Sequence, residues 1–242
     1  MPLLIERAQS NRIPQAMRYH LDVQGLPKTR KSNSALPPAK RIFLLSPANA
    51  AGKRAQLLLR DDATFALAER LRDGGLSLGE AFSFISGLYF RGKLAYASMF
   101  AAPPNKAPGV LVITACGGLI SPAALLTRTQ LCEISAAPVE ASEPRYRVPL
   151  ERDARRLYKQ ASDDCEIVLL GSVATPKYVE PLLAIFGERL VFPAEFAGRG
   201  DMSRGGLMLR CVRQGVELNY VPIVSAERHG PRPAKLDARP IS

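Results

Sequence analysis

The sequence predicts an α/β domain of three layers, in which a central, mainly parallel sheet of four to five strands is flanked by helices. Two observations predict this class. Short apolar runs that fit buried strands alternate along the chain with longer segments of helical character. The runs are continuous rather than alternating, which is typical of parallel strands that are covered on both faces.

Turn and capping residues set the boundaries of the predicted elements. The first apolar run ends at Ser46-Pro47, and Gly74-Gly75 stops a helix. Gly187 and Gly215 stop two more. In chain order the predicted elements are a strand at 41–45, a helix at 52–59, a helix from a cap at Asp61 or Asp62 to Gly74, a helix from Ser77 to about Ala101, a strand at 109–114, a helix at 146–158, a strand at 166–170, a helix at 178–185, a short strand at 190–192, a helix at 207–212 and a last strand at 217–223.

The predicted helix from Ser77 is the clearest of these elements. Ser77 and Glu80 have the spacing of a capping box. The helix is apolar nearly all round, so we expect it to be buried in the core, with Gly87 and Gly92 allowing close packing. Pro103-Pro104 ends it.

Charge and turn composition divide the chain into three parts. A single α/β domain is predicted over 41–224, between a flexible basic segment at 1–40 and an irregular basic tail at 225–242. Residues 1–40 carry seven Lys and Arg against two acidic residues, and residues 228–242 carry four against one. Such tails either supply salt-dependent affinity for nucleic acid or serve only as solubilising ends.

Composition argues against several classes of protein. The chain has no apolar run of the ~20 residues that a membrane span needs, and no secretory signal, so we expect a cytoplasmic, bacterial type of protein without a membrane partner. Four scattered cysteines, three of them in apolar neighbourhoods, are typical of buried reduced thiols. With only two histidines, we expect no metal site and no cofactor.

Polar and glycine-rich clusters follow the predicted strands, where ligands bind in parallel sheets. Helix starts after such loops present free N–H groups to anions, the glycine-rich stretch 196–206 suits an anion nest, and arginines add bidentate donors. The alternative is an ordinary strand-to-helix turn with exposed cations, since the spacing of a P-loop is absent. The candidate anion-binding residues are Ser46, Asn49, Gly52, Lys53, Arg54, Gly171, Ser172, Gly198, Arg199, Gly200, Ser203 and Arg204.

Asp201 is the candidate carboxylate for acid–base work, because the arginines beside it favour the ionised form and hence a general base. The alternative is an Asx turn or a cap for the helix at 207–212. His229 is a second candidate base, or a solvated tail residue. Tyr178 is a candidate to stack on a ligand or donate to it, or a half-buried core tyrosine, and Ser172 is otherwise a cap.

One succession of motifs spans residues 109–185: a strand leads to Gly118-Leu-Ile-Ser-Pro122, Tyr146 and a charged helix follow, and residues 168–171 and 178–182 come last. This succession resembles poorly characterised bacterial α/β families that are related in fold to the uracil-DNA glycosylase superfamily. The resemblance implies a three-layer domain with a parallel sheet of about four strands, and nucleotide or nucleic-acid chemistry. The chain lacks the Gly-Gln-Asp-Pro-Tyr-His and His-Pro-Ser-Pro loops of the active glycosylases, so that activity is not implied.

The leading hypothesis is therefore an enzyme directed at a nucleotide or nucleic acid. It has a phosphate-binding pocket at the carboxyl ends of the strands and hydrolyses a glycosidic or phosphate centre. One alternative is a non-catalytic nucleic-acid-binding module that uses the basic tails. Another is a protein-interaction factor of a bacterial system. The oligomeric state stays open.

Overall fold

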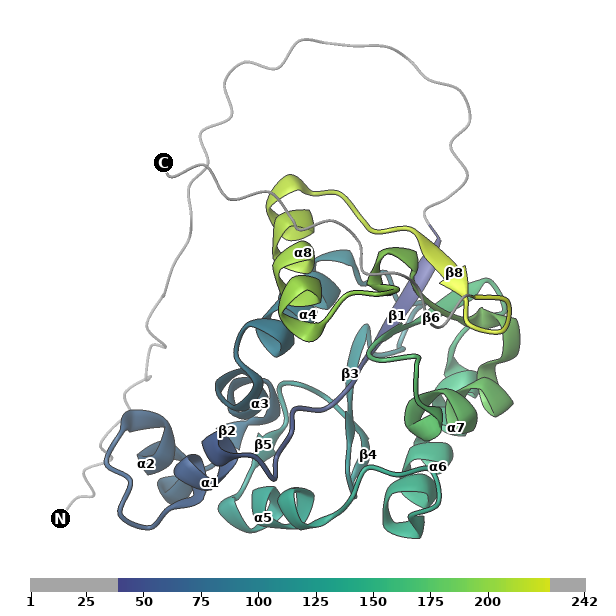
Figure 1. Ribbon diagram of the computed structural model, residues 1–242. Helices are drawn as coiled ribbons and strands as arrows, with labels where there is room; N and C mark the ends of the chain where they lie inside the picture. The colour runs from purple at the N-terminus through teal and green to yellow at the C-terminus, as the bar shows by residue number, and fades with distance from the viewer. Residues whose placement is uncertain (1–38, 227–242) are drawn as a thin grey trace, which may run out of the picture. The chain divides into compact units, whose positions relative to one another are not determined.

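A six-stranded sheet organises residues 39–226, the part of the chain that the computed structural model describes (Figure 1). The strand order is β4-β3-β1-β6-β7-β8. The inner four strands are parallel, and β4 and β8 pair antiparallel at the two edges. The strands are β1 (Lys40–Leu45), β3 (Val110–Thr114), β4 (Gly118–Ile120), β6 (Cys165–Leu170), β7 (Leu190–Pro193) and β8 (Tyr220–Pro222).

The predicted class is confirmed, and the sheet is larger than predicted. All five predicted strands are present, and β4 is the additional one. It is only three residues long, and Gly118 at its start has a φ of 73°, so the segment reads as a turn in the sequence. A separate two-stranded ladder pairs β2 (Leu76–Ser77) with β5 (Leu125–Leu126).

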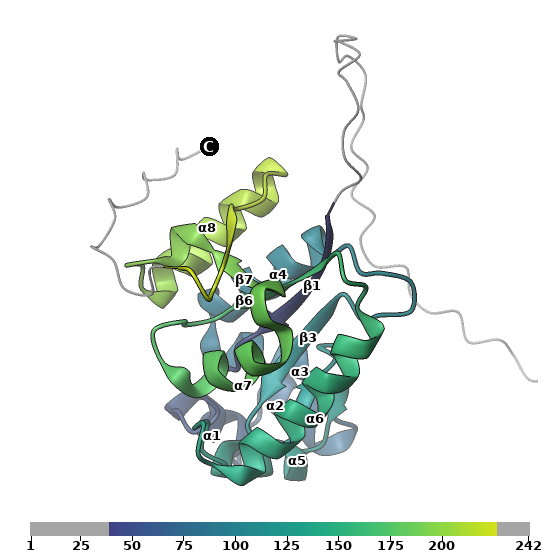
Figure 2. The same ribbon diagram turned by 90° about the vertical axis from the view of Figure 1, so that its right-hand side faces the viewer.

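Helices flank the sheet: α6 and α7 lie in front of the strands in Figure 2, with α3 and α4 behind them. Within residues 39–226 no helix has the length and apolar character that crossing a membrane requires. The helices are α1 (Lys53–Leu59), α2 (Ala66–Asp73), α3 (Leu78–Ser86), α4 (Leu88–Phe100), α5 (Arg128–Ala136), α6 (Pro144–Gln160), α7 (Pro176–Phe186) and α8 (Asp201–Gln214), with short 3-10 turns η1 (Gly187–Arg189) and η2 (Ala194–Phe196).

The helix predicted from Ser77 to Ala101 is two helices. The capping box of Ser77 and Glu80 is present and starts α3. Gly87 then takes a φ of 61° and a ψ of −127°, a conformation that ends α3 and begins α4. The predicted cap at Asp61 or Asp62 is wrong, because α2 starts after Phe65 and Asp62 instead binds Arg60.

The glycine-rich stretch 196–206 is also different from the prediction. The helix predicted at 207–212 begins six residues earlier, so Gly205 lies inside α8 rather than in a turn. A Cβ on Gly205 would lie 2.9 Å from the Leu88 carbonyl oxygen of α4, and one on Gly92 would lie 2.8 Å from the Gly205 carbonyl oxygen. These two glycines therefore let the backbones of α4 and α8 touch.

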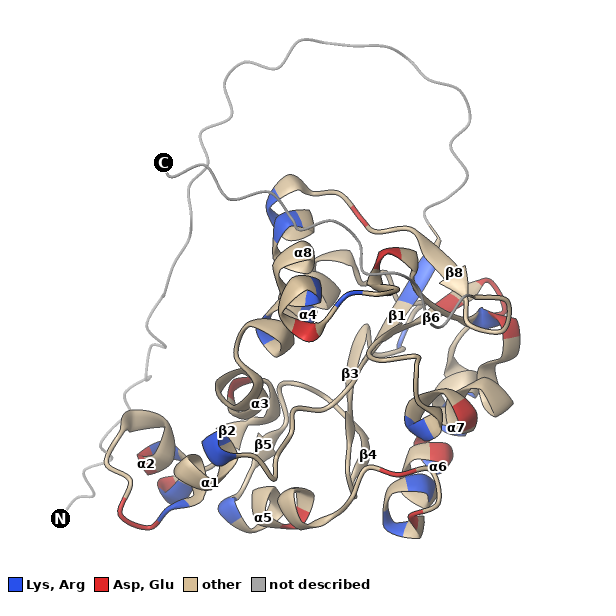
Figure 3. Ribbon diagram, viewed as in Figure 1, with Lys and Arg blue, Asp and Glu red and all other residues tan. Residues whose placement is uncertain are grey.

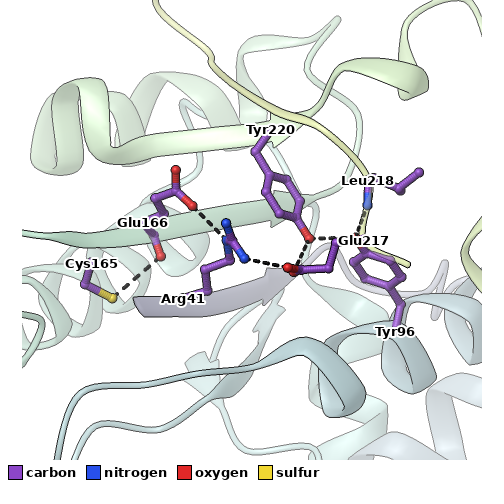
Figure 4. A network of polar contacts seen from close by, with 7 residues as sticks. All are labelled: Arg41, Tyr96, Cys165, Glu166, Glu217, Leu218 and Tyr220. Atoms are coloured by element: carbon purple, nitrogen blue, oxygen red, sulfur yellow. Dashed lines mark hydrogen bonds and ion pairs between the residues drawn. The ribbon is translucent and has the colours of Figure 1, made fainter. Parts of the chain in front are cut away.

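The amino ends of the central strands are tied together by a polar network around Arg41 of β1 (Figure 4). Its guanidinium donates to Glu166 of β6 at 2.8 Å and to Glu217, which precedes β8, at 2.6 Å. Tyr220 of β8 donates to Glu217, and its hydroxyl is 2.6 Å from that of Tyr96 in α4. One cluster thus joins three strands and a helix.

Charged side chains of both signs are mixed along the exposed helices, as α6 illustrates in Figure 3. The loop from Ser46 to Gly52, by contrast, contains no charged residue. The four cysteines are free thiols, with Cys165 and Cys211 buried, Cys116 partly buried and Cys132 exposed. The buried-thiol interpretation therefore fails for Cys132.

Candidate functional site

A pocket of about 510 Å³ opens where the parallel strands end, which is the place that the sheet topology favours for a ligand. The register brings this edge together, because Leu45 of β1 is paired with Val112 of β3 and with Leu170 of β6. The pocket is bounded by the loop 46–51, by residues between Ile134 and Val139, by the start of α7 and by Asp201.

Ser46 lies in this pocket and is held from behind by a buried lysine. Lys93 of α4 is fully buried, and its Nζ donates to the Ser46 carbonyl oxygen at 2.6 Å and to the Ser46 Oγ at 2.8 Å. The same Nζ lies 4.4 Å from the centre of the Tyr89 ring and 5.0 Å from that of Phe90. Lys93 has no ion pair with any residue in 39–226, so its amine is bound by a hydroxyl, a carbonyl and two ring faces.

The pKa of Lys93 is lowered from 10.5 to about 7, chiefly because burial penalises the ammonium. The negative charge of Asp201 acts in the opposite direction, and the positive charge of Arg204 adds to the lowering. Both protonation states are therefore accessible near neutral pH. A lysine with such a pKa is better suited to transfer a proton than to serve as a permanent positive charge.

Tyr89 brings a second unusual group to the pocket. Its side chain is buried and lines the cavity, and its hydroxyl makes no hydrogen bond of regular geometry within the described chain, although the side chains of Arg204 and Ser46 approach it. Burial raises the pKa of Tyr89 to about 12, and the positive charge of Arg204 opposes the rise. A buried hydroxyl without such a bond is rare in folded proteins, and it is satisfied here if a ligand occupies the pocket.

The sequence-predicted residues Tyr178 and Asp201 both line this pocket. Tyr178 is buried in α7, and burial raises its pKa, as do the charges of Tyr89 and Asp201. Asp201 is the first residue of α8, with its side chain 68% exposed and 3.8 Å from Arg204. It is not the cap of the helix, since Gly200 takes that position without a side-chain bond.

Only some of the anion-binding residues predicted after β1 and β6 line the pocket. Ser46, Asn49 and Ser172 line the pocket, and the Ser172 Oγ accepts a bond from the Ala174 amide. Gly171 lies behind Ser46, where an added Cβ would be 2.9 Å from the Ser46 Cβ. Gly52, Lys53 and Arg54 do not line the pocket, and the Arg54 guanidinium instead lies 5.6 Å from the centre of the Phe84 ring.

The arginines of the stretch 196–206 are hydrogen-bonded to other groups of the protein. Arg204 donates to the Phe196 carbonyl oxygen at 2.9 Å. Arg199 donates to the Glu195 carbonyl oxygen and, at 3.3 Å, to the Ser203 Oγ. Gly198 with a φ of 68° turns the chain between them, ahead of the cap at Gly200. These groups fix the approach to α8, so the structure does not gather them around a ligand. His229 lies outside the described residues.

Lys93 and Tyr89 were not singled out by the sequence, which shows them only as members of an apolar helix. One signal was available. Tyr89, Lys93 and Tyr96 are four and three residues apart, so they share one face of α4, and all three are buried. A lysine on the buried face of such a helix is uncommon, because lysine is almost never fully buried without a partner.

No family model, curated protein or solved structure matches this chain. Among residues 39–226 there is also no group of three or more His, Cys, Asp and Glu side chains placed to hold a metal ion. Function is therefore inferred from the pocket itself.

Proposed function

We propose that the chain is an enzyme that binds a nucleoside or nucleotide unit in the pocket at the carboxyl edge of the sheet and acts on it there. The observation that carries the proposal is that Ser46 and Tyr89 line one cavity, while the buried Lys93 lies behind Ser46 and is hydrogen-bonded to it. The pKa of Lys93 is strongly lowered, and a titratable group perturbed in this way directly behind the lining of a cleft is a candidate for a functional site.

The lining supports a ligand of this class. The volume is in the range of small-molecule sites, and small apolar side chains such as Ala50 and Ala115 leave room for a flat ring. Tyr89 and Tyr178 supply aromatic surface together with hydroxyl groups. Lys177 adds a cation that suits a phosphate, and Asp201 adds a carboxylate that suits a sugar hydroxyl or a water molecule.

Ligand binding is tested by thermal unfolding of the full chain with nucleosides, nucleoside monophosphates and dinucleotides. We expect at least one of them to raise the melting temperature, because a ligand that binds only the folded state stabilises it. Tyr89→Phe should weaken that ligand's binding about five- to tenfold, the worth of one hydrogen bond. Tyr158→Phe, on the exposed side of α6, is the matched control. No shift with any of these compounds contradicts the proposal.

The non-catalytic alternative makes a different prediction. If the basic N-terminal segment carries the binding, deletion of residues 1–38 should abolish nucleic-acid binding together with its dependence on salt. If the pocket carries it, the shortened chain keeps its affinity for the mononucleotide. Calorimetric titrations at two salt concentrations separate these outcomes.

A further inference from the structure

We infer that Ser46 is a nucleophile and Lys93 its general base, and that the pair cleaves a phosphate ester through a phosphoserine intermediate. The inference rests on the proposed function for the place where the ligand lies, and it names the bond that is broken. It combines a serine that lines the pocket, with an exposed fraction of 5%, and a fully buried amine 2.8 Å from the serine Oγ. No carboxylate–histidine pair is needed, since serine with lysine is an established variant of this arrangement.

The backbone around Ser46 holds the hydroxyl in one place. Ser46 directly follows β1, and its amide donates to the Leu170 carbonyl oxygen of β6 at 3.1 Å. Gly171 packs against its Cβ from the neighbouring strand end. The second bond of Lys93, to the Ser46 carbonyl oxygen, orients the amine toward the same residue. A nucleophile and its base are thus placed by two strands and a helix rather than by a free loop.

Lys93 is suited to be the base rather than the nucleophile or a structural cation. Its side chain has no exposed surface, so a substrate atom cannot reach Nζ, whereas Ser46 keeps 5% of its surface exposed and is among the residues that line the cavity. A lysine kept only as a buried charge needs a carboxylate partner, and Lys93 has none among the described residues. The ammonium form donates to both Ser46 oxygens, whereas the neutral amine keeps its bond to the carbonyl oxygen and uses its lone pair to accept a hydrogen bond from the Ser46 hydroxyl.

Every proton that Lys93 Nζ exchanges passes through Ser46 Oγ, because Nζ is fully buried. Nζ takes the hydroxyl proton as Ser46 Oγ forms a bond to phosphorus. The bond from phosphorus to the leaving oxygen breaks, and that oxygen takes a proton from water in the pocket. Water then attacks the phosphoserine and releases its proton to solvent, the bond from phosphorus to Ser46 Oγ breaks, and the freed Oγ recovers its proton from the Lys93 ammonium. Tyr89 provides a donor for a non-bridging phosphoryl oxygen, since its hydroxyl is protonated and makes no hydrogen bond of regular geometry in the described chain.

The nucleophile is tested with a fluorophosphonate probe, in which attack at phosphorus expels fluoride and leaves a stable adduct. Intact mass and peptide mapping of the full chain should show one adduct on Ser46. The labelling rate should rise with pH and level off above about pH 7, as the amine loses its proton. No adduct, an adduct on another serine, or a rate that keeps rising to about pH 10 overturns the inference.

The base is tested with Lys93→Met, which should slow labelling at least about a hundredfold, whereas the exposed Lys159→Met should leave it unchanged. An equal rate in Lys93→Met overturns the role of Lys93. If that variant does not fold, the pH profile of the unaltered chain decides. The two proposals fail separately. Binding of a nucleotide without any adduct removes the serine–lysine inference alone, and an adduct without nucleotide binding removes the ligand class alone.

Discussion

A buried lysine couples proton binding to folding as well as to chemistry. Lys93 has a pKa of 10.5 in the unfolded chain and about 7 in the folded one. Between these values the unfolded state holds a proton that the folded state has released, so stability rises with pH across that window. Above about pH 10.5 both states are neutral and the cost of burial vanishes, whereas below about pH 7 both are charged and the cost is complete.

Lys93→Met removes this titrating group, so a comparison of the variant with the unaltered chain gives the contribution of Lys93 to the pH dependence of stability. We expect the unfolding free energy of the variant, minus that of the unaltered chain, to fall by about 1.4 kcal/mol for each pH unit between about pH 7 and pH 10. Urea unfolding of the two proteins in parallel measures the difference, and the other titrating groups cancel. A difference that does not change with pH would mean that the folded lysine keeps an ordinary pKa.

Two tyrosines of α4 provide a second test at the residue scale. The Tyr89 hydroxyl makes no hydrogen bond of regular geometry within residues 39–226. The Tyr96 hydroxyl, by contrast, accepts a hydrogen bond from the Leu218 amide at 2.8 Å and contacts the Tyr220 hydroxyl. Tyr89→Phe should therefore leave stability unchanged or raise it by about 1 kcal/mol, while Tyr96→Phe should cost about 1–3 kcal/mol. Chemical denaturation ranks the two. A loss in Tyr89→Phe as large as that in Tyr96→Phe would show that the Tyr89 hydroxyl is satisfied.

At the scale of elements, the packing of α4 on α8 places the site. One face of α4 carries Tyr89, Lys93 and Tyr96 toward the sheet, and Gly92 lies against Gly205 of α8. The close approach brings Asp201, at the start of α8, to the pocket that Tyr89 also lines. The glycines of the stretch 196–206 thus serve partly to seat a helix, which in turn presents the carboxylate.

Gly92→Ala tests this contact. The new Cβ would lie 2.8 Å from the Gly205 carbonyl oxygen and 3.0 Å from its Cα, both of them backbone atoms that cannot rotate away. We expect a loss of about 1–3 kcal/mol in unfolding free energy. Gly74→Ala is the control, because nothing lies within 4 Å of its added Cβ and its φ is −156°. Equal effects of the two substitutions would show that α4 and α8 move apart freely.

At the scale of the whole described domain, the two edges of the sheet differ in how far their polar groups are paired. The carboxyl edge holds an open pocket, the Tyr89 hydroxyl without a hydrogen bond of regular geometry, and Lys93, which forms no ion pair with a carboxylate in residues 39–226. The amino edge is closed by the network around Arg41, in which each charge has a partner. Sites that bind ligands commonly leave polar groups incompletely satisfied, while a scaffold distant from them is saturated.

Arg41→Met tests whether the network at the amino edge contributes to stability without affecting the pocket at the carboxyl edge. It leaves the partly buried carboxylates of Glu166 and Glu217 without their cation, so we expect a loss of about 1–3 kcal/mol in unfolding free energy. The rate at which the fluorophosphonate probe labels Ser46 should stay within about twofold at temperatures where the variant is folded. Loss of labelling in the folded variant would mean that the two edges are coupled.

Local signals in the sequence determined the class of the fold and most of its elements. Continuous apolar runs identify buried strands wherever they fall, and the capping box at Ser77 acts within one turn of helix, so both are readable without the rest of the chain. The edge strand β4 is too short to leave such a signal. The break at Gly87 and the long α8 depend on packing against distant residues, and they were predicted incorrectly.

The candidate site was located by topology but assembled only by the tertiary structure. The sequence by itself placed Ser46, Ser172, Tyr178 and Asp201 at one edge, because parallel strands end together. It did not show that Arg54, Arg199 and Arg204 have partners elsewhere, or that Lys93 reaches Ser46 from 47 positions away along the chain. The physical reason is that the state of a side chain depends on its surroundings. A lysine becomes a candidate base only when packing removes its water, and that is decided by the fold as a whole.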